Sequence, residues 1–569
     1  MNMKKILLNA MLFCTAIALG GCSDFFETNT DDMLNNEDYI SEESEIYSGY
    51  IGILTKMQEI GDKSIYLYET RGEVVEPTTT APRELYSLYN YENDLTGNSY
   101  ADPSGYYELI NACNDYMIRL KDYKENHTLD QNIYKTLISG SLRIKAWTFL
   151  TIAKLYGKVV WVDKPMNSLR DLSKFKTLEF DDAIKACKNL LDIGYDDIDG
   201  TTEFSQYTGN SFMTWANATE TADQTEFGLY DRMTPPYFAL YGEICLWLGK
   251  YQTCINVIQG RMNSDFQATS NQSVAWLRNA MLLGKFKDFW GGENPHNYES
   301  VSAIIYSYKN NQNNALVKHF DPDYPNKYWL APSEVAVNRF KDNDFTPLGS
   351  SRSEDFRTAR TFKQSNGKWS VCKFRPSTNR DAFRNDIYIY IYRGVDLYFM
   401  LAEAFNQLGN KEAVDALINN GVENYINEFD KNEDNVLSGT WNGFTPHWTS
   451  GTTMYTSREG KSELKARSKY GDEGIRGCRY TSYSGEDPLA FGENKQENDE
   501  LILKEMMLEM ACEGKVYPTM IRMARRYNDP SIMAKYIGEK YEGKGNAEAI
   551  RTKIMNGDYF IHWDLSTEK

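Results

Sequence analysis

The 569-residue sequence lacks most of the signatures that mark catalytic and metal sites. Its five histidines are scattered, at positions 127, 296, 319, 447 and 562, which disfavours a histidine metal site. It contains no G-x-S-x-G, H-E-x-x-H or G-x-G-x-x-G motif and no P-loop. The corresponding hydrolases, metalloproteases and nucleotide-binding enzymes are therefore excluded. We expect no catalytic residues, no metal and no cofactor.

The cysteines also lack a recognisable pattern. Beyond Cys14 and Cys22, seven remain, an odd number without any C-x-x-C pair. They predict neither a disulfide framework nor a zinc site. Four of them, at positions 113, 187, 245 and 254, fall within helical patterns and are expected to be small core residues. A disulfide between two of these four stays open in an oxidising compartment.

Long apolar runs are absent except at the start of the chain. Lys4 and Lys5 precede an uncharged run, Ile6–Leu19, which leads into Leu-Gly-Gly-Cys. A positive flank, a short apolar core and small residues before a break are typical of a secretory signal peptide. A hydrophobic residue, two small residues and a cysteine form a bacterial lipobox, so Cys22 is predicted to be the lipidated first residue of the mature chain.

No later segment offers the roughly 20 apolar residues that a membrane span needs. We therefore expect a signal peptide at residues 1–21, a lipidated tether at 22–36 and one domain at 37–569. Loss of the signal peptide changes the formal charge from −18 to −20. So acidic a chain does not suit nucleic acid, which needs a basic face. The 40 tyrosines and 11 tryptophans suit a neutral ligand such as a sugar, although many must be core residues.

Apolar periodicity predicts a mostly α-helical fold. In the stretch Gln131–Met166, apolar residues from Leu142 to Tyr156 recur every three or four positions, and Gly157 ends the helix. Similar patterns predict helix pairs near residues 37–123, 130–193, 235–264 and 388–428. In the last two pairs Leu246, Gly249 and Cys254 occupy the positions of Ala404, Gly409 and Ala413. The pairs are similar to tetratricopeptide repeats, which must stack to bury a core.

Long inserts rich in Gly, Thr, Asn and aromatic residues separate these pairs, at residues 62–103, 196–234, 263–385 and 431–498. A further helical pattern, Leu501–Pro530, is interrupted at Gly514 and Pro518. Its acidic residues, at positions 505, 509 and 513, are expected to form a solvated helix face.

Ligand-binding residues are expected in the inserts, since long ordered loops on a rigid scaffold often carry binding sites. A sugar site needs aromatic platforms with polar groups at their edges. The candidates are Tyr89, Tyr91 and Asn98 in the first insert, Trp290 and Trp329 in the third, and Trp441, Trp448 and Tyr455 in the fourth.

Four segments together, in this order, resemble the SusD/RagB family of nutrient-binding outer-membrane lipoproteins from Bacteroidetes-type bacteria. They are the lipobox followed by CSDFFE, SGYYELINACNDYM, SLRIKAWTFLTIAKLYGKVVWVDKP and YRGVDLYFMLAEAFNQLGN. The C-terminal helix departs from the family pattern, because Met506, Val516 and Thr519 stand where Arg, Arg and Asp are usual. The departure puts the family's salt-bridge network in that helix in doubt.

The resemblance implies a SusD-like fold with four tetratricopeptide-like helix pairs and a second, loop-rich face. It also implies a lipid-anchored protein of the cell outer membrane that captures an oligosaccharide or a related nutrient. The implied partner is a TonB-dependent transporter of the SusC type, and the family shares no catalytic residues. Arg143 and Trp147 lie in the clearest family segment, where they are expected to support the face toward the transporter rather than a sugar site.

Other functions stay open from the residues alone. Abundant Asp and Glu could supply the two carboxylates of a surface glycoside hydrolase. A scaffold that binds only protein would have no small ligand, and the nutrient could be a peptide or a cobalamin-like molecule. Residues 430–435 begin like a calcium loop, but Asn435 replaces the turn glycine and Trp441 the final glutamate.

Overall fold

The structure is a computed structural model. It describes residues 40, 42–192, 232–268, 289–290, 299–308, 310–323, 325–343, 355–375, 386–420, 474–479 and 488–563. The lipobox, the tether and the calcium-like segment lie outside these ranges. Within them, none of the helices is both long and apolar enough to span a membrane.

The first two helix pairs are confirmed. Helix α3 (Glu43–Ile60) packs against α6 (Ser104–Asn126), and α7 (Gln131–Tyr156) packs against α8 (Phe180–Leu191). The Asp130 side chain caps α7 by accepting hydrogen bonds from the first-turn N–H groups. Gly157 ends the helix in the left-handed conformation, with φ of 71°.

The third and fourth pairs repeat one design, as expected. Helix α11 (Tyr237–Trp247) is followed by α12 (Tyr251–Ala268), and α17 (Gly394–Gln407) by α18 (Lys411–Asp415) and a π-helical turn, η5 (Ala416–Asn420). The two turns use left-handed glycines, since φ is 68° at Gly249 and 79° at Gly409. Cys254 and Ala413 are both fully buried near the start of the second helix, but they are offset by one position, because Cys254 follows its glycine by five residues and Ala413 by four.

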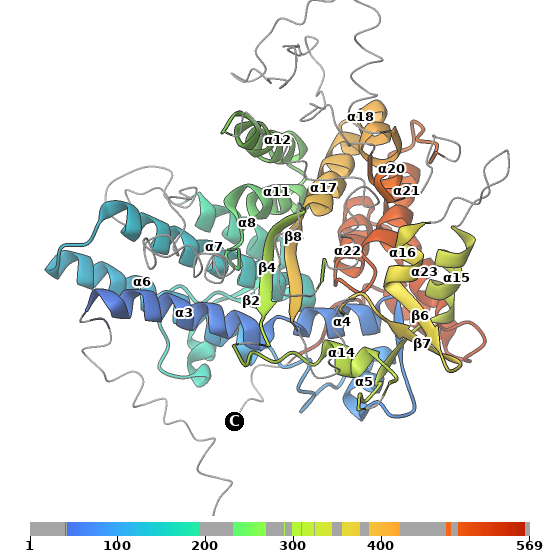
Figure 1. Ribbon diagram of the computed structural model, residues 1–569, viewed down its shortest axis with the longest axis horizontal. Coiled ribbons are helices and arrows are strands. Elements are labelled where there is room, and N and C mark those ends of the chain that lie inside the picture. The colour runs from blue at the N-terminus through green and yellow to red at the C-terminus, as the bar shows by residue number, and fades with distance from the viewer. Residues whose placement is uncertain are drawn as a thin grey trace, which may run out of the picture.

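The remaining helices lie around these pairs, and those from α20 onward make up the C-terminal part of the chain (Figure 1). They are α4 (Lys63–Arg71), α5 (Arg83–Tyr89), η1 (Leu169–Lys174), α14 (Leu316–Phe320), α15 (Glu334–Asp342), α16 (Phe356–Thr361), α20 (Gly474–Arg479), α21 (Lys495–Glu509), α22 (Val516–Tyr527), α23 (Ser531–Glu539) and α24 (Ala547–Met555).

The strands of the described residues form four antiparallel pairs. They are β1 (Val75–Pro77) with β5 (Leu330–Pro332), β2 (Lys158–Val160) with β3 (Thr177–Glu179), β4 (Ser300–Tyr306) with β8 (Ile387–Arg393), and β6 (Phe362–Ser365) with β7 (Lys368–Val371). The β4–β8 pair lies near the middle of the molecule in Figure 1. Every residue of β8 is buried, so this strand is covered on both faces.

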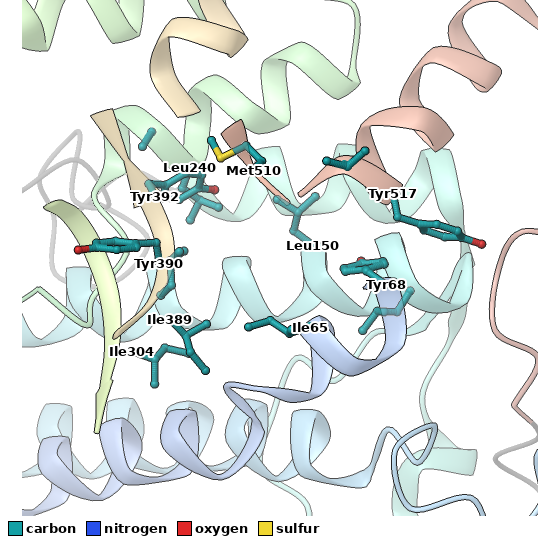
Figure 2. Close-up of a cluster of buried hydrophobic side chains, with 14 of the residues drawn as sticks. Ile65, Tyr68, Leu150, Leu240, Ile304, Ile389, Tyr390, Tyr392, Met510 and Tyr517 are labelled. Atoms are coloured by element: carbon teal, nitrogen blue, oxygen red, sulfur yellow. The ribbon is translucent and has the colours of Figure 1, made fainter. Parts of the chain in front are cut away.

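The core lies where β8 meets helices from both ends of the chain. Figure 2 shows Ile389 and Tyr390 of β8 beside Ile304 of β4, with Leu150 of α7 and Ile65 of α4 facing them. Tyr68 and Tyr517, far apart in sequence, have ring centroids 5.8 Å apart. Such close packing of apolar side chains from several elements supplies most of the stabilisation of a fold of this kind.

Two segments differ from the sequence-based expectation. The first insert contains α4, which is buried from Ile65 to Arg71 and belongs to the core. The Gly, Thr and Asn residues of this insert lie mainly in its later part, so the average composition of the insert did not indicate a helix. Pro518 does not interrupt a helix; it lies in the first turn of α22, where a proline fits without loss of a hydrogen bond. Gly514 makes the break between α21 and α22, with φ of 70°.

The cysteine expectation is confirmed for the four helical positions. Cys113, Cys187, Cys245 and Cys254 are all buried. All seven cysteines of the body are free thiols, so the disulfide that the sequence left open between two of the four is not formed.

Candidate functional site

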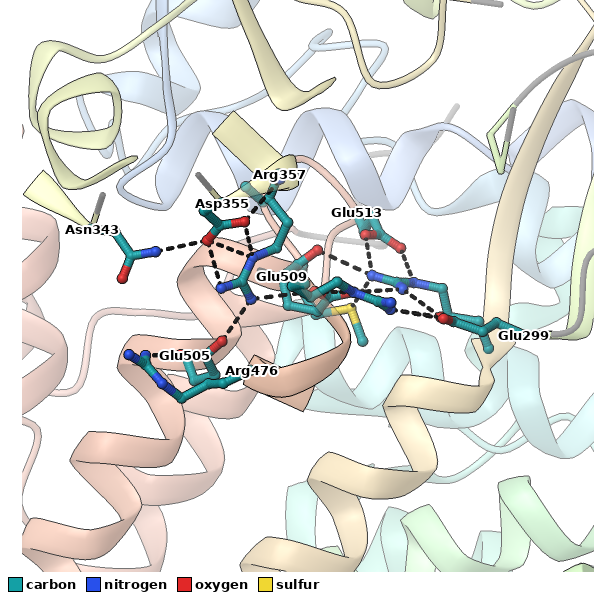
Figure 3. A network of polar contacts seen from close by, with 12 residues as sticks. Glu299, Asn343, Asp355, Arg357, Arg476, Glu505, Glu509 and Glu513 are labelled. Atoms are coloured by element: carbon teal, nitrogen blue, oxygen red, sulfur yellow. Dashed lines mark hydrogen bonds and ion pairs between the residues drawn. The ribbon is translucent and has the colours of Figure 1, made fainter. Parts of the chain in front are cut away.

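A buried network of ionised side chains joins two of the inserts to α21 (Figure 3). The prediction that the acidic residues form a solvated helix face is wrong, because Glu505, Glu509 and Glu513 are at most 6% exposed. Glu509 lies at the centre of the network and forms ion pairs with Arg393 at 2.8 Å and with Arg479 at 3.0 Å. A salt-bridge network therefore forms here despite the departures in this helix, because its arginines come from other elements.

Each further carboxylate of the network also meets a cation. Glu505 pairs with Arg357 at 2.6 Å and with Arg476 at 2.8 Å. Glu299, just before β4, pairs with Arg479 at 2.8 Å. Burial opposes ionisation of Glu509, but three arginines outweigh it and hold the pKa of this carboxyl well below its usual range. The network is a structural clamp of paired charges.

Trp290, one of the expected sugar platforms, belongs to this clamp. Its side chain is 1% exposed. Lys373 Nζ lies 4.6 Å and the Arg393 guanidinium 5.4 Å from the ring centroid, in cation–π geometry. The structure thus places Trp290 in the interior, where its ring stabilises buried cations.

The candidates of the first insert are also held by internal contacts. The Tyr91 hydroxyl donates to the Arg71 carbonyl at 2.6 Å, and the Arg71 guanidinium lies 4.0 Å from the ring centroid. Asn98 is 4% exposed and closes a turn by accepting from the N–H groups of Tyr100 and Ala101. Tyr89 is 9% exposed and packs on Tyr541, with ring centroids 4.6 Å apart. Its hydroxyl lies near Lys544, at 3.4 Å.

Trp329 is the one described candidate whose ring lies at the surface, half buried. One face stacks on His319, with ring centroids 3.9 Å apart and an interplanar angle of 21°. The exposed Lys327 lies over the ring, its Nζ 4.4 Å from the centroid. Beneath the stack, the Tyr66 hydroxyl lies 2.7 Å from His319 Nδ1. A tryptophan backed by a buried stack and approached by a long, solvated side chain can receive a flat apolar ligand surface.

Backbone strain marks the residue before it. Tyr328 is half buried with φ of 49°, a left-handed conformation that bulky residues rarely adopt. The first insert holds it there: Thr78 and Thr80 donate hydroxyl hydrogen bonds to the Tyr328 carbonyl, and Thr80 also to the Lys327 carbonyl. We define the Trp329 face as Thr78–Thr80 with Lys327–Trp329. It unites residues of the first and third inserts.

The β6–β7 hairpin lies against this face. The Tyr328 hydroxyl donates to the Trp369 carbonyl of β7 at 2.6 Å, and Lys368 Nζ lies 5.6 Å from the Tyr328 ring centroid. In Figure 1 this region, around α14 and the β6–β7 hairpin, lies at the lower right.

Other hollows lie elsewhere in the described residues, and two of them are considered as alternatives. A cavity of about 90 Å³ lies near Lys154, Glu243 and Arg522, too small for a sugar chain. A groove of about 680 Å³ lies beside β2, lined by Tyr107, Phe175 and Trp563 among others. Its volume suits a small ligand, which makes it the second candidate site. In the described part of the chain no three His, Cys, Asp or Glu side chains gather to hold a metal.

Several sequence predictions stay predictions. Trp441, Trp448, Tyr455 and the lipidation site Cys22 lie outside the described residues. Sequence reasoning missed Lys327 and Tyr328, the neighbours of Trp329. The adjacent Lys-Tyr-Trp residues could have indicated an aromatic surface with a neighbouring cation. The positive φ of Tyr328 and its threonine clamp could not be predicted, because they depend on tertiary contacts.

This chain is similar to known proteins of one family. Residues 300–561 match the model of the SusD family. The resemblance to the SusD/RagB family expected from the sequence motifs is thus confirmed. No curated protein matches the sequence. A SusD superfamily protein of Bacteroides vulgatus matches the fold with a TM-score of 0.56 at 13% identity, covering 91% of this chain and 95% of the other.

Two more SusD-like structures share the fold. A SusD-like carbohydrate-binding protein of B. vulgatus has a TM-score of 0.53 at 12% identity, covering 84% of this chain and 83% of the other. NanU of B. fragilis has a TM-score of 0.51 at 17% identity, covering 89% and 92% respectively. The mostly helical, SusD-like fold expected from the sequence is thereby confirmed.

Proposed function

We propose that the chain is a carbohydrate-binding lipoprotein of the outer-membrane surface, which captures an oligosaccharide and delivers it to a SusC-like TonB-dependent transporter. One observation carries the proposal: Trp329 is a half-buried platform, stacked at 3.9 Å on His319 and fixed by a threonine clamp from another insert. A rigid aromatic surface of this kind fits the apolar C–H face of a sugar ring.

The groups around Trp329 supply the edge contacts that a sugar requires. When a sugar displaces Lys327 from the Trp329 ring, the Lys327 ammonium is free to donate hydrogen bonds to the sugar hydroxyl groups. Thr80 adds an exposed hydroxyl, and Tyr86 lies close by, because its hydroxyl donates to the Thr78 carbonyl at 2.8 Å. Because the clamp already fixes Tyr328 and Trp329, little conformational entropy is lost when ligand binds.

The names of similar proteins support carbohydrate as the ligand class. One structural neighbour is a SusD-like carbohydrate-binding protein and another is a putative sugar-binding protein, both from B. vulgatus. Trp441, Trp448 and Tyr455 remain proposed ligand residues of the fourth insert. Trp290, Tyr91 and Asn98 are assigned structural roles here, since their side chains are nearly fully buried.

Binding without catalysis is part of the proposal. The ion network uses its carboxylates in pairs with arginines, so it leaves none of them as a general acid. We expect purified protein to bind one class of oligosaccharide in a glycan screen and to release no reducing ends from it. Release of reducing ends by contaminant-free protein would favour a surface glycoside hydrolase. Binding of peptides alone, or copurification of a transporter without any small-ligand binding, would also overturn the carbohydrate proposal.

A further inference from the structure

The Trp329 face is positively charged, in a chain whose formal net charge is −18. Two exposed lysines lie over its aromatic rings, Lys327 over Trp329 at 4.4 Å and Lys368 over Tyr328 at 5.6 Å. Lys318 is exposed on the adjoining α14, and its backbone carbonyl accepts hydrogen bonds from the N–H groups of Lys327 and Tyr328. Two ammonium groups therefore lie over the aromatic rings, and a third exposed lysine adjoins them in the fold.

None of these three lysines forms an ion pair with a carboxylate of the described residues. Many exposed lysines elsewhere do, such as Lys158 with Glu179 and Lys411 with Glu493. Glu76 is the carboxylate whose charge, after burial, raises the pKa of Tyr328, and it is paired with Lys544. Among the described residues, no carboxylate forms an ion pair with the lysines of this face.

The positive charge of the lysines also affects the pKa of His319, the buried ring behind Trp329. Burial first, and then the positive charges of Lys327 and Lys318, lower the pKa of His319 to about 4. The imidazole is therefore neutral at physiological pH and adds no charge of its own. The lysines supply the positive potential, and the rings supply the platform.

We infer that the Trp329 face takes an anionic oligosaccharide, one that carries carboxylate or sulfate groups, with the sugar ring on Trp329 and the anionic substituents at Lys327 and Lys368. The inference rests on the proposed carbohydrate-binding function and specifies its ligand. Lysine is suited to the task, because an ammonium on a flexible stem can reach a carboxylate or a sulfate without a fixed geometry.

The test compares charged and neutral forms of the same glycan by isothermal titration calorimetry at low ionic strength. One pair is oligogalacturonate and its carboxyl-reduced form, which keeps the backbone and replaces each carboxylate by a primary alcohol. The other pair is dextran sulfate and dextran. The two pairs separate carboxylate from sulfate as the source of charge. The proposal predicts that the charged member of at least one pair binds at least about tenfold more tightly than its neutral partner.

Two double variants locate the effect. Lys327→Gln with Lys368→Gln removes two charges from the face, and the charged preference should fall by about tenfold or more. The control, Lys341→Gln with Lys176→Gln, removes two charges from exposed lysines that also lack ion pairs with described residues. Lys341 lies over Trp369 at 5.0 Å, so this control also matches the lysine-over-ring arrangement. The control should retain the preference.

Four results would overturn the inference: tighter binding of a neutral member, no binding of either charged polymer, an unchanged preference in the Lys327 variant, or an equal loss in the control. Tighter binding of a neutral glycan would leave the proposed carbohydrate-binding function intact. Failure of that function would appear instead as no response to any glycan in the broader screen.

Discussion

Individual buried carboxylates behave in two opposite ways in this molecule. Glu509 is ionised among three arginines, whereas Glu69 in α4 has no cation in hydrogen-bond contact and accepts only the Gly514 N–H. Burial raises the pKa of Glu69 to about 8. The sequence could not separate these cases, because both are glutamates in helical patterns and their partners come from distant segments.

Loss of the central carboxylate charge should destabilise the clamp. Glu509→Gln leaves Arg393 and Arg479 facing a neutral amide in a site that excludes water, and removal of one partner from a buried pair costs about 3–5 kcal/mol. We expect this loss in the free energy of unfolding, measured by urea denaturation. Glu179→Gln, in an exposed pair with Lys158, should change little. Equal effects of the two variants would contradict a buried network.

Glu69 makes stability depend on pH in the opposite direction. An unfolded glutamate ionises near its ordinary pKa of 4.5, and the folded one near 8, so between these values the folded state binds the extra proton. This residue therefore lowers stability as pH rises from about 5 to 8. Glu69→Gln keeps an oxygen to accept from Gly514, and its stability relative to the wild type should increase over that range, by at most about 1.4 kcal/mol per pH unit. Denaturation midpoints that differ by a constant amount from pH 5 to 8 would refute this.

At the scale of elements, helix α7 was predictable and its neighbours were only partly so. The apolar spacing from Leu142 to Tyr156 and the stop at Gly157 follow from local rules, and the structure confirms both. The contact of α7 with α3 does not follow from local rules. Gly140 lies against Tyr50 of α3, where a Cβ would be 2.1 Å from the hydroxyl oxygen, and that hydroxyl is bonded to Thr234 at 2.7 Å.

This close approach gives a prediction with an internal control. Gly140→Ala should destabilise the protein by about 1–3 kcal/mol, because Tyr50 is 4% exposed and must shift within a packed core. Gly52→Ala, in α3, meets nothing within 4 Å and should stabilise the helix by about 0.5–1 kcal/mol. Thermal or urea unfolding measures both. A stabilising Gly140→Ala would show that α3 and α7 are packed less tightly than described.

Tyr50→Phe offers a second check on the same contact. Removal of the hydroxyl relieves the closest clash, although the ring carbon Cζ would still lie 3.0 Å from the new Cβ. The cost of Gly140→Ala should therefore be smaller in the Tyr50→Phe background than in the wild type.

At the scale of the whole molecule, the family resemblance and the order of helix pairs could be predicted, but the site could not. The aromatic residues of the inserts favoured Trp290 over Trp329 as a ligand platform. The folded chain reverses this preference, because Trp290 packs on Lys373 and Arg393 in the interior while Trp329 reaches the surface. Burial of an aromatic residue depends on contacts between segments far apart in sequence, and composition carries no record of these contacts.

Membrane attachment of the whole chain is predicted to depend on one residue, Cys22. Cys22→Ala removes the acylation site, and no described helix offers another means of crossing a membrane. We expect the variant to leave the membrane fraction when cells are fractionated, while Cys113→Ala, a buried core thiol, stays with it. Membrane retention of the Cys22 variant would contradict a lipid anchor at this position.

The claim that the Trp329 face holds the ligand is tested most directly by calorimetric titration of three proteins with an oligosaccharide that the wild type binds. Trp329→Ala removes the platform of this face, and Trp563→Ala removes an aromatic residue of the 680 Å³ groove. Loss of one stacked aromatic residue should weaken binding by tenfold or more, about 1.4 kcal/mol or greater. The account predicts this loss in Trp329→Ala and wild-type affinity in Trp563→Ala. Wild-type affinity in a folded Trp329→Ala protein would contradict it.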